Sequence, residues 1–213
     1  FKKIIAFSKD ELKTLATSQL LRVFSLFAQW NFLPPEQFRA DLDAIFQSRV
    51  ESWNDKDFFF FAYARKVTPM ELSEAFLAKY KNQVLKKFEG FSVETKMEIL
   101  GAELYHSMRW SAQETQFLLR TTLQAVSNFN GVMQIKPLKE LYRGLLFLQG
   151  TEGSAFQASI TSLIQALEVQ MKKNNLSLAT NGRSGSLEDT NPVIPLRIHF
   201  EARLDEYLGQ TEK

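Results

Sequence analysis

Residues 57–66 read DFFFFAYARK, and the four consecutive phenylalanines at 58–61 decide how this chain folds. Successive residues of an α-helix are rotated by about 100°, so four large side chains in a row point almost all the way round it. Such a helix has to be covered on nearly every side. The alternative is a buried strand, because phenylalanine and tyrosine also favour β-structure. Helical signals on both sides favour the helix, with core residues and not a cofactor as its neighbours.

The stretch 35–53 predicts an amphipathic helix. Its apolar residues recur on a 3.6-residue period, while its acidic residues lie off that stripe. Pro35 suits the first turn of a helix. Capping boxes beginning at Thr68 and Ser111, and a glycine before Thr151, predict three further helix starts. The apolar stripe of the helix predicted at 35–53 consists of Phe38, Leu42, Ile45, Phe46, Val50 and Trp53.

A shorter and more apolar helix is predicted before each amphipathic helix. The resulting pairs begin near Ser18, Asp55, Ser92 and Pro137, at steps of 37, 37 and 45 residues. A period of this length, built as helix–turn–helix, indicates an α-solenoid. We therefore predict an all-α, right-handed array of about four helix–turn–helix repeats with a separate C-terminal helix. Stacking explains the phenylalanines, because the first helix of a pair then contacts its partner and both neighbouring repeats.

The predicted array covers residues 1–173, with a short helix beginning near Lys9. Residues 174–195 are rich in glycine, serine and asparagine, which predicts a flexible linker. Residues 196–213 predict an amphipathic C-terminal helix. This helix either folds back to cap the array or docks on another chain, and we expect docking.

The composition excludes several kinds of site. Cysteine is absent, which excludes disulfides and thiolate zinc sites. His106 and His199 stand in no metal-binding spacing, and no phosphate-binding loop occurs. His106 is expected to be a hydrogen-bonded residue of the core or its rim and not a catalytic base. No apolar run reaches the roughly 18 residues needed to cross a membrane. We therefore predict no enzymatic activity, no metal, no cofactor, no small-molecule substrate and no membrane contact.

Basic and aromatic residues recur at corresponding places in the predicted first helices. Equivalent positions of a solenoid fall on one surface, so these residues are expected to form a strip that contacts phosphates and bases. Arginine and tryptophan suit single-stranded RNA, because every base has a face to stack on. Alternatively, the helix dipole alone favours cations near helix C-termini, and Trp30 belongs to the core. The predicted RNA-binding residues are Arg22, Trp30, Arg65, Lys66, Arg109, Trp110 and Arg143.

The pair LLRVFSLFAQWNFLPPEQFRADLDAIF, residues 20–46, resembles the degenerate helical repeats of organellar RNA-binding proteins. The similar classes are the octatricopeptide and heptatricopeptide repeats and those of FAST-kinase-type mitochondrial proteins. Residues 18–53 match the pattern best, 55–89 match with a shortened first helix, 92–128 match loosely and 137–173 match in outline. The resemblance implies RNA binding or assembly work in a mitochondrion or plastid. The nuclease-like domain that often accompanies such repeats has no counterpart in residues 174–213.

From this resemblance we expect a non-catalytic subunit of a mitochondrial ribonucleoprotein assembly that acts in RNA processing, editing or translation. The alternative is a protein-only scaffold whose aromatic groove grips a partner helix or peptide. The net charge of +2 is mild for an RNA-binding protein, which usually shows a concentrated basic footprint. We therefore expect contacts shared with other protein subunits of a large complex.

Overall fold

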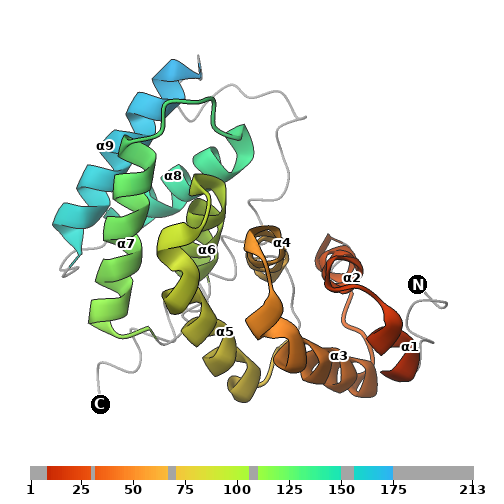
Figure 1. Ribbon diagram of the computed structural model, residues 1–213. Helices are drawn as coiled ribbons and strands as arrows, with labels where there is room; N and C mark the ends of the chain where they lie inside the picture. The colour runs from red at the N-terminus through yellow and green to blue at the C-terminus, as the bar shows by residue number, and fades with distance from the viewer. Residues whose placement is uncertain (1–8, 30–31, 67–70, 106–109, 150–155, 175–213) are drawn as a thin grey trace. The chain divides into compact units, whose positions relative to one another are not determined.

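The computed structural model describes residues 9–29, 32–66, 71–105, 110–149 and 156–174. Within these ranges every regular element is a helix, which confirms the all-α prediction (Figure 1). The phenylalanine run lies in a helix and not in a strand. The α-helices are α1 (Lys9–Thr14), α2 (Thr17–Gln29), α3 (Glu36–Arg49), α4 (Asp55–Arg65), α5 (Glu74–Lys87), α6 (Val93–Tyr105), α7 (Ala112–Ser127), α8 (Ile135–Gln149) and α9 (Gln157–Lys173), and two 3₁₀ turns are η1 (Val50–Ser52) and η2 (Phe88–Gly90).

The helices pack mainly on elements two places apart in the chain. The even-numbered helices follow one another, α2 on α4, α4 on α6 and α6 on α8 (Figure 1). Among the odd-numbered helices, α1 packs on α3, α3 on α5 and α7 on α9. Further contacts join α6 to α7 and α8 to α9. Contacts of this kind are what a helical-hairpin array requires, and the right-handed solenoid of about four repeats stays a prediction.

Helix α4 is buried on the side of Phe58 and Phe61. Both rings are fully buried, whereas Phe59 is half-buried and Phe60 is 39% exposed. The Phe61 ring stacks on Phe24 of α2, with 5.6 Å between ring centroids and 11° between planes. It also lies edge-on against rings of α3 and α5, so one residue joins four helices. These edge-on neighbours are Phe46 and Phe76, at 6.0 and 5.4 Å.

Local capping explains where several helices begin. Asn54 caps α4 through a capping box with Asp57, and the predicted box at Ser111 caps α7 as expected. The helix start predicted at Thr68 is wrong. Thr68 itself lies outside the described residues, and α5 begins at Glu74 behind the N-cap Ser73.

Long polar side chains at the ends of three odd-numbered helices bind carbonyl groups at the end of an earlier odd-numbered helix. Carbonyls at and just after a helix C-terminus often lack a donor from their own helix, so side chains of other helices can satisfy them, although the Val126 carbonyl also accepts from the Phe129 backbone N–H at 3.3 Å. The arrangement recurs, which is what a repeated unit predicts, and it fixes how successive hairpins are placed. Arg49 donates to the Lys13 and Leu15 carbonyls at 2.6 Å each, Lys87 to those of Glu51 and Trp53 at 2.7 and 3.0 Å, and Gln170 to those of Val126 and Phe129 at 2.9 and 3.0 Å.

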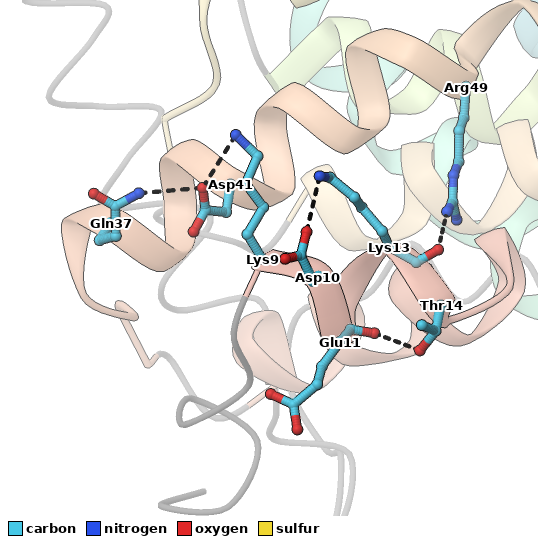
Figure 2. A network of polar contacts seen from close by, with 8 residues as sticks. All are labelled: Lys9, Asp10, Glu11, Lys13, Thr14, Gln37, Asp41 and Arg49. Atoms are coloured by element: carbon cyan, nitrogen blue, oxygen red, sulfur yellow. Dashed lines mark hydrogen bonds and ion pairs between the residues drawn. The ribbon is translucent and has the colours of Figure 1, made fainter.

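Figure 2 shows the first of these contacts, between Arg49 and Lys13, within a wider polar network that joins α1 to α3. Asp41 of α3 accepts a hydrogen bond from Gln37 at 3.1 Å and forms an ion pair with Lys9 at 3.7 Å. The short helix expected near Lys9 therefore exists as α1 and is held on α3 by charge as well as by its carbonyl contacts.

The described helices belong to one compact unit. The predicted linker at 174–195, apart from Asn174, and the predicted helix at 196–213 lie outside the described residues, so those two boundaries stay predictions. Within the part of the chain that the structure describes, no helix combines the length and apolarity needed to cross a bilayer.

Phe61→Ala is expected to lower the free energy of unfolding by about 3–5 kcal/mol, because it removes a buried ring and leaves a cavity. The matched control is Phe60→Ala in the same helix, which should cost clearly less, about 1 kcal/mol, because that ring is 39% exposed and its removal leaves no closed cavity. Urea unfolding followed by circular dichroism measures both. Equal losses in the two variants would contradict the orientation of α4 described above.

Candidate nucleic-acid interface

The five predicted RNA-binding residues that the structure describes do not form one strip. Arg22 on α2 and Arg143 on α8 are exposed, as expected. Lys66 is buried, and Arg65 and Trp110 are half-buried. Trp30 and Arg109 lie outside the described residues.

Lys66 is a structural residue, and its expected place on the surface is wrong. Only 6% of it is exposed, and its ammonium group forms ion pairs with Glu98 of α6 and with Glu140 of α8, the latter at 2.5 Å. Burial alone lowers the pKa of Lys66, but these two carboxylates more than offset burial and hold the pKa above its ordinary value. The charged ammonium therefore links α4, α6 and α8 from inside.

Arg65 and Trp110 belong to a second polar cluster, on the side of α4 and α6 that faces α5. The Trp110 indole N–H donates to Glu103, and the Lys81 ammonium of α5 lies 5.1 Å from the centre of the Trp110 ring. Burial raises the pKa of Glu103 to about 8, against the opposing charge of Arg65. Glu103 keeps part of its surface exposed, yet its Oε1 atom has no accessible surface, which accounts for the raised pKa.

The outward side of α4 carries a different set of residues. Lys56, Phe60 and Tyr63 recur at i, i+4 and i+7, which places them on the side opposite the buried Phe58 and Phe61. Lys56 and Phe60 are exposed, and Tyr63 is half-buried. This side of α4 therefore presents an ammonium group, an apolar ring and a phenol to solvent.

Helix α8 presents a matching side. Lys136, Glu140 and Arg143 recur at i, i+4 and i+7, opposite the buried residues Leu138 and Leu145. Lys136 and Arg143 are exposed, while Glu140 is half-buried and already paired with the buried Lys66. Lys66 also faces Glu98, so its single charge does not balance both carboxylates, and Lys136, 3.9 Å from Glu140, supplies the second positive charge.

Tyr63 and Lys136 connect these two outward sides directly. The Lys136 ammonium donates to the Tyr63 hydroxyl at 2.9 Å and lies 4.6 Å from the centre of its ring. Residues 95–102 of α6 are all buried, so that stretch adds no side chains to the surface here. The phenol and the ammonium therefore make the junction between α4 and α8.

We define the even-helix face as the outward sides of α2, α4 and α8. On α2, Arg22 lies opposite Phe24, whose ring packs on α3 and α4. The face differs from the odd-numbered helices, whose exposed residues carry both signs of charge, as Glu36, Glu74, Lys79, Lys86 and Lys172 show. The residues of the even-helix face are Arg22, Lys56, Phe60, Tyr63, Lys136, Arg143 and Phe147, the last of which follows Arg143 by four residues and is 44% exposed.

The chemistry of this face is that of anion binding and ring stacking. Four cationic groups suit phosphates, and an exposed aromatic ring suits a base. Elsewhere, the structure has an apolar cavity of about 150 Å³ among α6, α7, α8 and α9, with Leu100, Leu119 and Ile160 in its wall. In the described ranges, no group of three or more histidine, aspartate or glutamate side chains is placed to hold a metal ion.

Sequence reasoning missed Lys56, Phe60, Tyr63 and Lys136. The signal for three of them was present, because Lys56, Phe60 and Tyr63 share one side of the predicted helix at spacings of four and three residues. Which of the four phenylalanines faces outward depends on contacts with α2, α3 and α5, and these are not visible in the local sequence.

Comparisons with known proteins found no family model, no curated protein and no solved structure that matches this chain. The resemblance to organellar helical repeats therefore stays a prediction.

Lys66→Met is expected to destabilise the fold by about 3–5 kcal/mol, because it leaves the Glu98 carboxylate buried without its partner. The double variant Lys66→Met, Glu98→Leu should recover most of this loss, since the buried pair is then replaced by apolar side chains. Urea unfolding at pH 7 measures both. A single variant as stable as the wild type would contradict the buried ion pair.

The raised pKa of Glu103 predicts a stability that falls as pH rises. The folded state holds this proton up to about pH 8, whereas an unfolded glutamate releases it near its ordinary pKa of 4.5. The contribution is therefore complete below pH 4.5 and is lost as pH rises towards 8. Its slope cannot exceed about 1.4 kcal/mol per pH unit. Glu103→Gln should flatten the profile of unfolding free energy over this window, and an unchanged slope would contradict the assignment.

Proposed function

We propose that this protein binds RNA through the even-helix face, as a non-catalytic subunit of a mitochondrial ribonucleoprotein assembly. The observation that carries the proposal is that the outward sides of three helices present four cations and two exposed phenylalanine rings, while the one carboxylate among them is paired with Lys66 and Lys136. Phosphate contacts supply most of the affinity of such surfaces, and rings add base stacking. The choice of RNA, and of the mitochondrion, comes from the sequence resemblance.

The modest number of cations supports a role inside a larger assembly. Four phosphate contacts give weak binding at physiological salt, so neighbouring subunits would have to share the RNA. This agrees with the net charge of +2 for the whole chain. We therefore place the protein among other protein subunits and not as an autonomous RNA-binding factor.

A protein-only scaffold is the second candidate. It is favoured by Val132 and Ile135, two exposed apolar residues around the start of α8, with 81% and 49% of their surface exposed. The apolar cavity of about 150 Å³ is much too small to hold a peptide helix, so a protein partner would have to bind on the open surface.

The triple variant Arg22→Ala, Lys56→Ala, Arg143→Ala is expected to bind single-stranded RNA more weakly at every sequence tested. Each lost phosphate contact removes about 0.7 from the slope of log affinity against log salt concentration, so the slope should become about 2 shallower. Fluorescence anisotropy with a labelled mixed-sequence RNA, over a series of salt concentrations, measures this change.

The matched control removes the same charge from the odd-numbered helices, as Lys79→Ala, Lys86→Ala and Lys172→Ala, all of which are exposed. It should leave affinity and slope close to the wild-type values. Equal losses in the two triple variants would show that only net charge matters and would contradict the proposed face. Wild-type affinity that barely responds to salt would favour the scaffold instead.

A further inference from the structure

Phe60 is the most exposed member of the phenylalanine run. It is 39% exposed, whereas Phe58 and Phe61 of the same helix are fully buried. Its ring meets the Phe59 ring edge-to-face at 5.6 Å, which holds it against the helix surface. Single exposed apolar residues are common in soluble proteins, so exposure alone assigns no role.

The charges around Phe60 give the exposed ring a specific setting. Lys56 lies one turn before it, and Tyr63, which carries the Lys136 ammonium on its ring, lies one turn after it. Four residues of an α-helix rise about 6 Å and three rise about 4.5 Å. The ring therefore lies between two cationic groups along the axis of α4.

We propose that Phe60 stacks on one base of a single-stranded RNA, while Lys56 and Lys136 contact the phosphates on either side of that base. The inference rests on the proposed function, because it assigns the strand type and the base-contacting residue of the same face. A ring between two cations matches the alternation of base and phosphate along a single strand.

Tyr63 is not a second stacking platform. Its ring already carries two ammonium groups, with Lys136 at 4.6 Å and the buried Lys66 at 5.7 Å from the ring centre. Its hydroxyl accepts a hydrogen bond from Lys136. Tyr63 therefore positions Lys136, and Phe60 supplies the accessible ring of this helix.

A base paired within a duplex cannot reach Phe60. The two faces of a base inside a duplex are covered by neighbouring bases, and only the edges of that base are accessible from the grooves. The ring should therefore contribute to the binding of single strands and not to the binding of duplex RNA, whereas the cations contribute to both through phosphates.

The test compares the wild type with Phe60→Ala on three probes of equal length, which are single-stranded RNA, duplex RNA and an abasic strand. Phe60→Ala is expected to weaken single-stranded RNA binding roughly 5- to 150-fold, the range for loss of one stacked base. Affinity for the duplex and for the abasic strand should stay unchanged, and so should the salt slope. Phe60→Trp should keep or exceed wild-type affinity.

Val169→Ala is the matched control, because Val169 is an exposed apolar residue on the odd-numbered helix α9, with 52% of its surface exposed. It should leave binding of all three probes unchanged. Circular dichroism and urea unfolding of each variant show that the fold is intact, as expected for surface positions.

The outcomes separate the two proposals. If Phe60→Ala binds single-stranded RNA as tightly as the wild type while the Arg22, Lys56, Arg143 triple variant does not, stacking is overturned and RNA binding by the face stands. If Phe60→Ala weakens all three probes equally, stacking is also overturned. A wild-type protein that binds no RNA overturns both proposals. If Phe60→Ala no longer binds a partner protein but still binds RNA as tightly as the wild type, the ring belongs to a protein-docking surface and stacking is overturned.

Discussion

Burial of the aromatic side chains around α4 is the interaction on which the rest of this structure depends. The Phe61 ring contacts rings of α2, α3 and α5, and Phe58 contacts Tyr80 of α5 at 5.7 Å between centroids. Each such ring removes a large apolar area from water, and edge-to-face pairs add about 0.5–1.5 kcal/mol to that burial. Helices α2 and α4, and helices α3 and α5, are thereby joined by aromatic rings.

Polar contacts then set the positions that aromatic packing leaves free. Rings tolerate sliding more readily than a charged group in the interior does, because a buried charge that loses its partner is costly. Lys66 meets Glu98 and Glu140 on two different helices, so α4, α6 and α8 can be joined in only one register. Lys136 connects this buried cluster to the even-helix face, because it contacts both Glu140 and Tyr63.

Local sequence predicted the presence and type of the helices better than their ends. The phenylalanine run predicted α4, and the Ser111 capping box predicted the start of α7. The start of α5 was predicted at Thr68, whereas Ser73 is its N-cap. Asp43 of α3 holds Ser73 in place, because it accepts a hydrogen bond from the Ser73 backbone N–H at 2.9 Å and another from the Ser73 hydroxyl at 2.6 Å. A tertiary contact therefore selects the cap, and the local sequence of α5 does not contain it.

The residues of the candidate site also differ in how far the local sequence predicts where they point. Arg65 follows Phe61 by four residues and Phe58 by seven, so its inward direction could have been predicted from helical spacing. The burial of Lys66 could not, because its partners Glu98 and Glu140 are far away in sequence and come close only after α6 and α8 pack. A cation at the end of a helix has the same local pattern whether it faces solvent or an ion pair.

The recurring carbonyl contacts of Arg49, Lys87 and Gln170 bear on how such a chain can change length during evolution. Each donor lies 34 to 44 residues after the carbonyls that it contacts, so a change in the loops between them can leave the direction of the donor on its own helix unaltered. Insertion of a single residue inside the helix that carries the donor has a different effect, because it rotates the donor by about 100° and breaks its contacts with the two carbonyl groups. The position of each donor within its helix is therefore more constrained than the length of the loops before it.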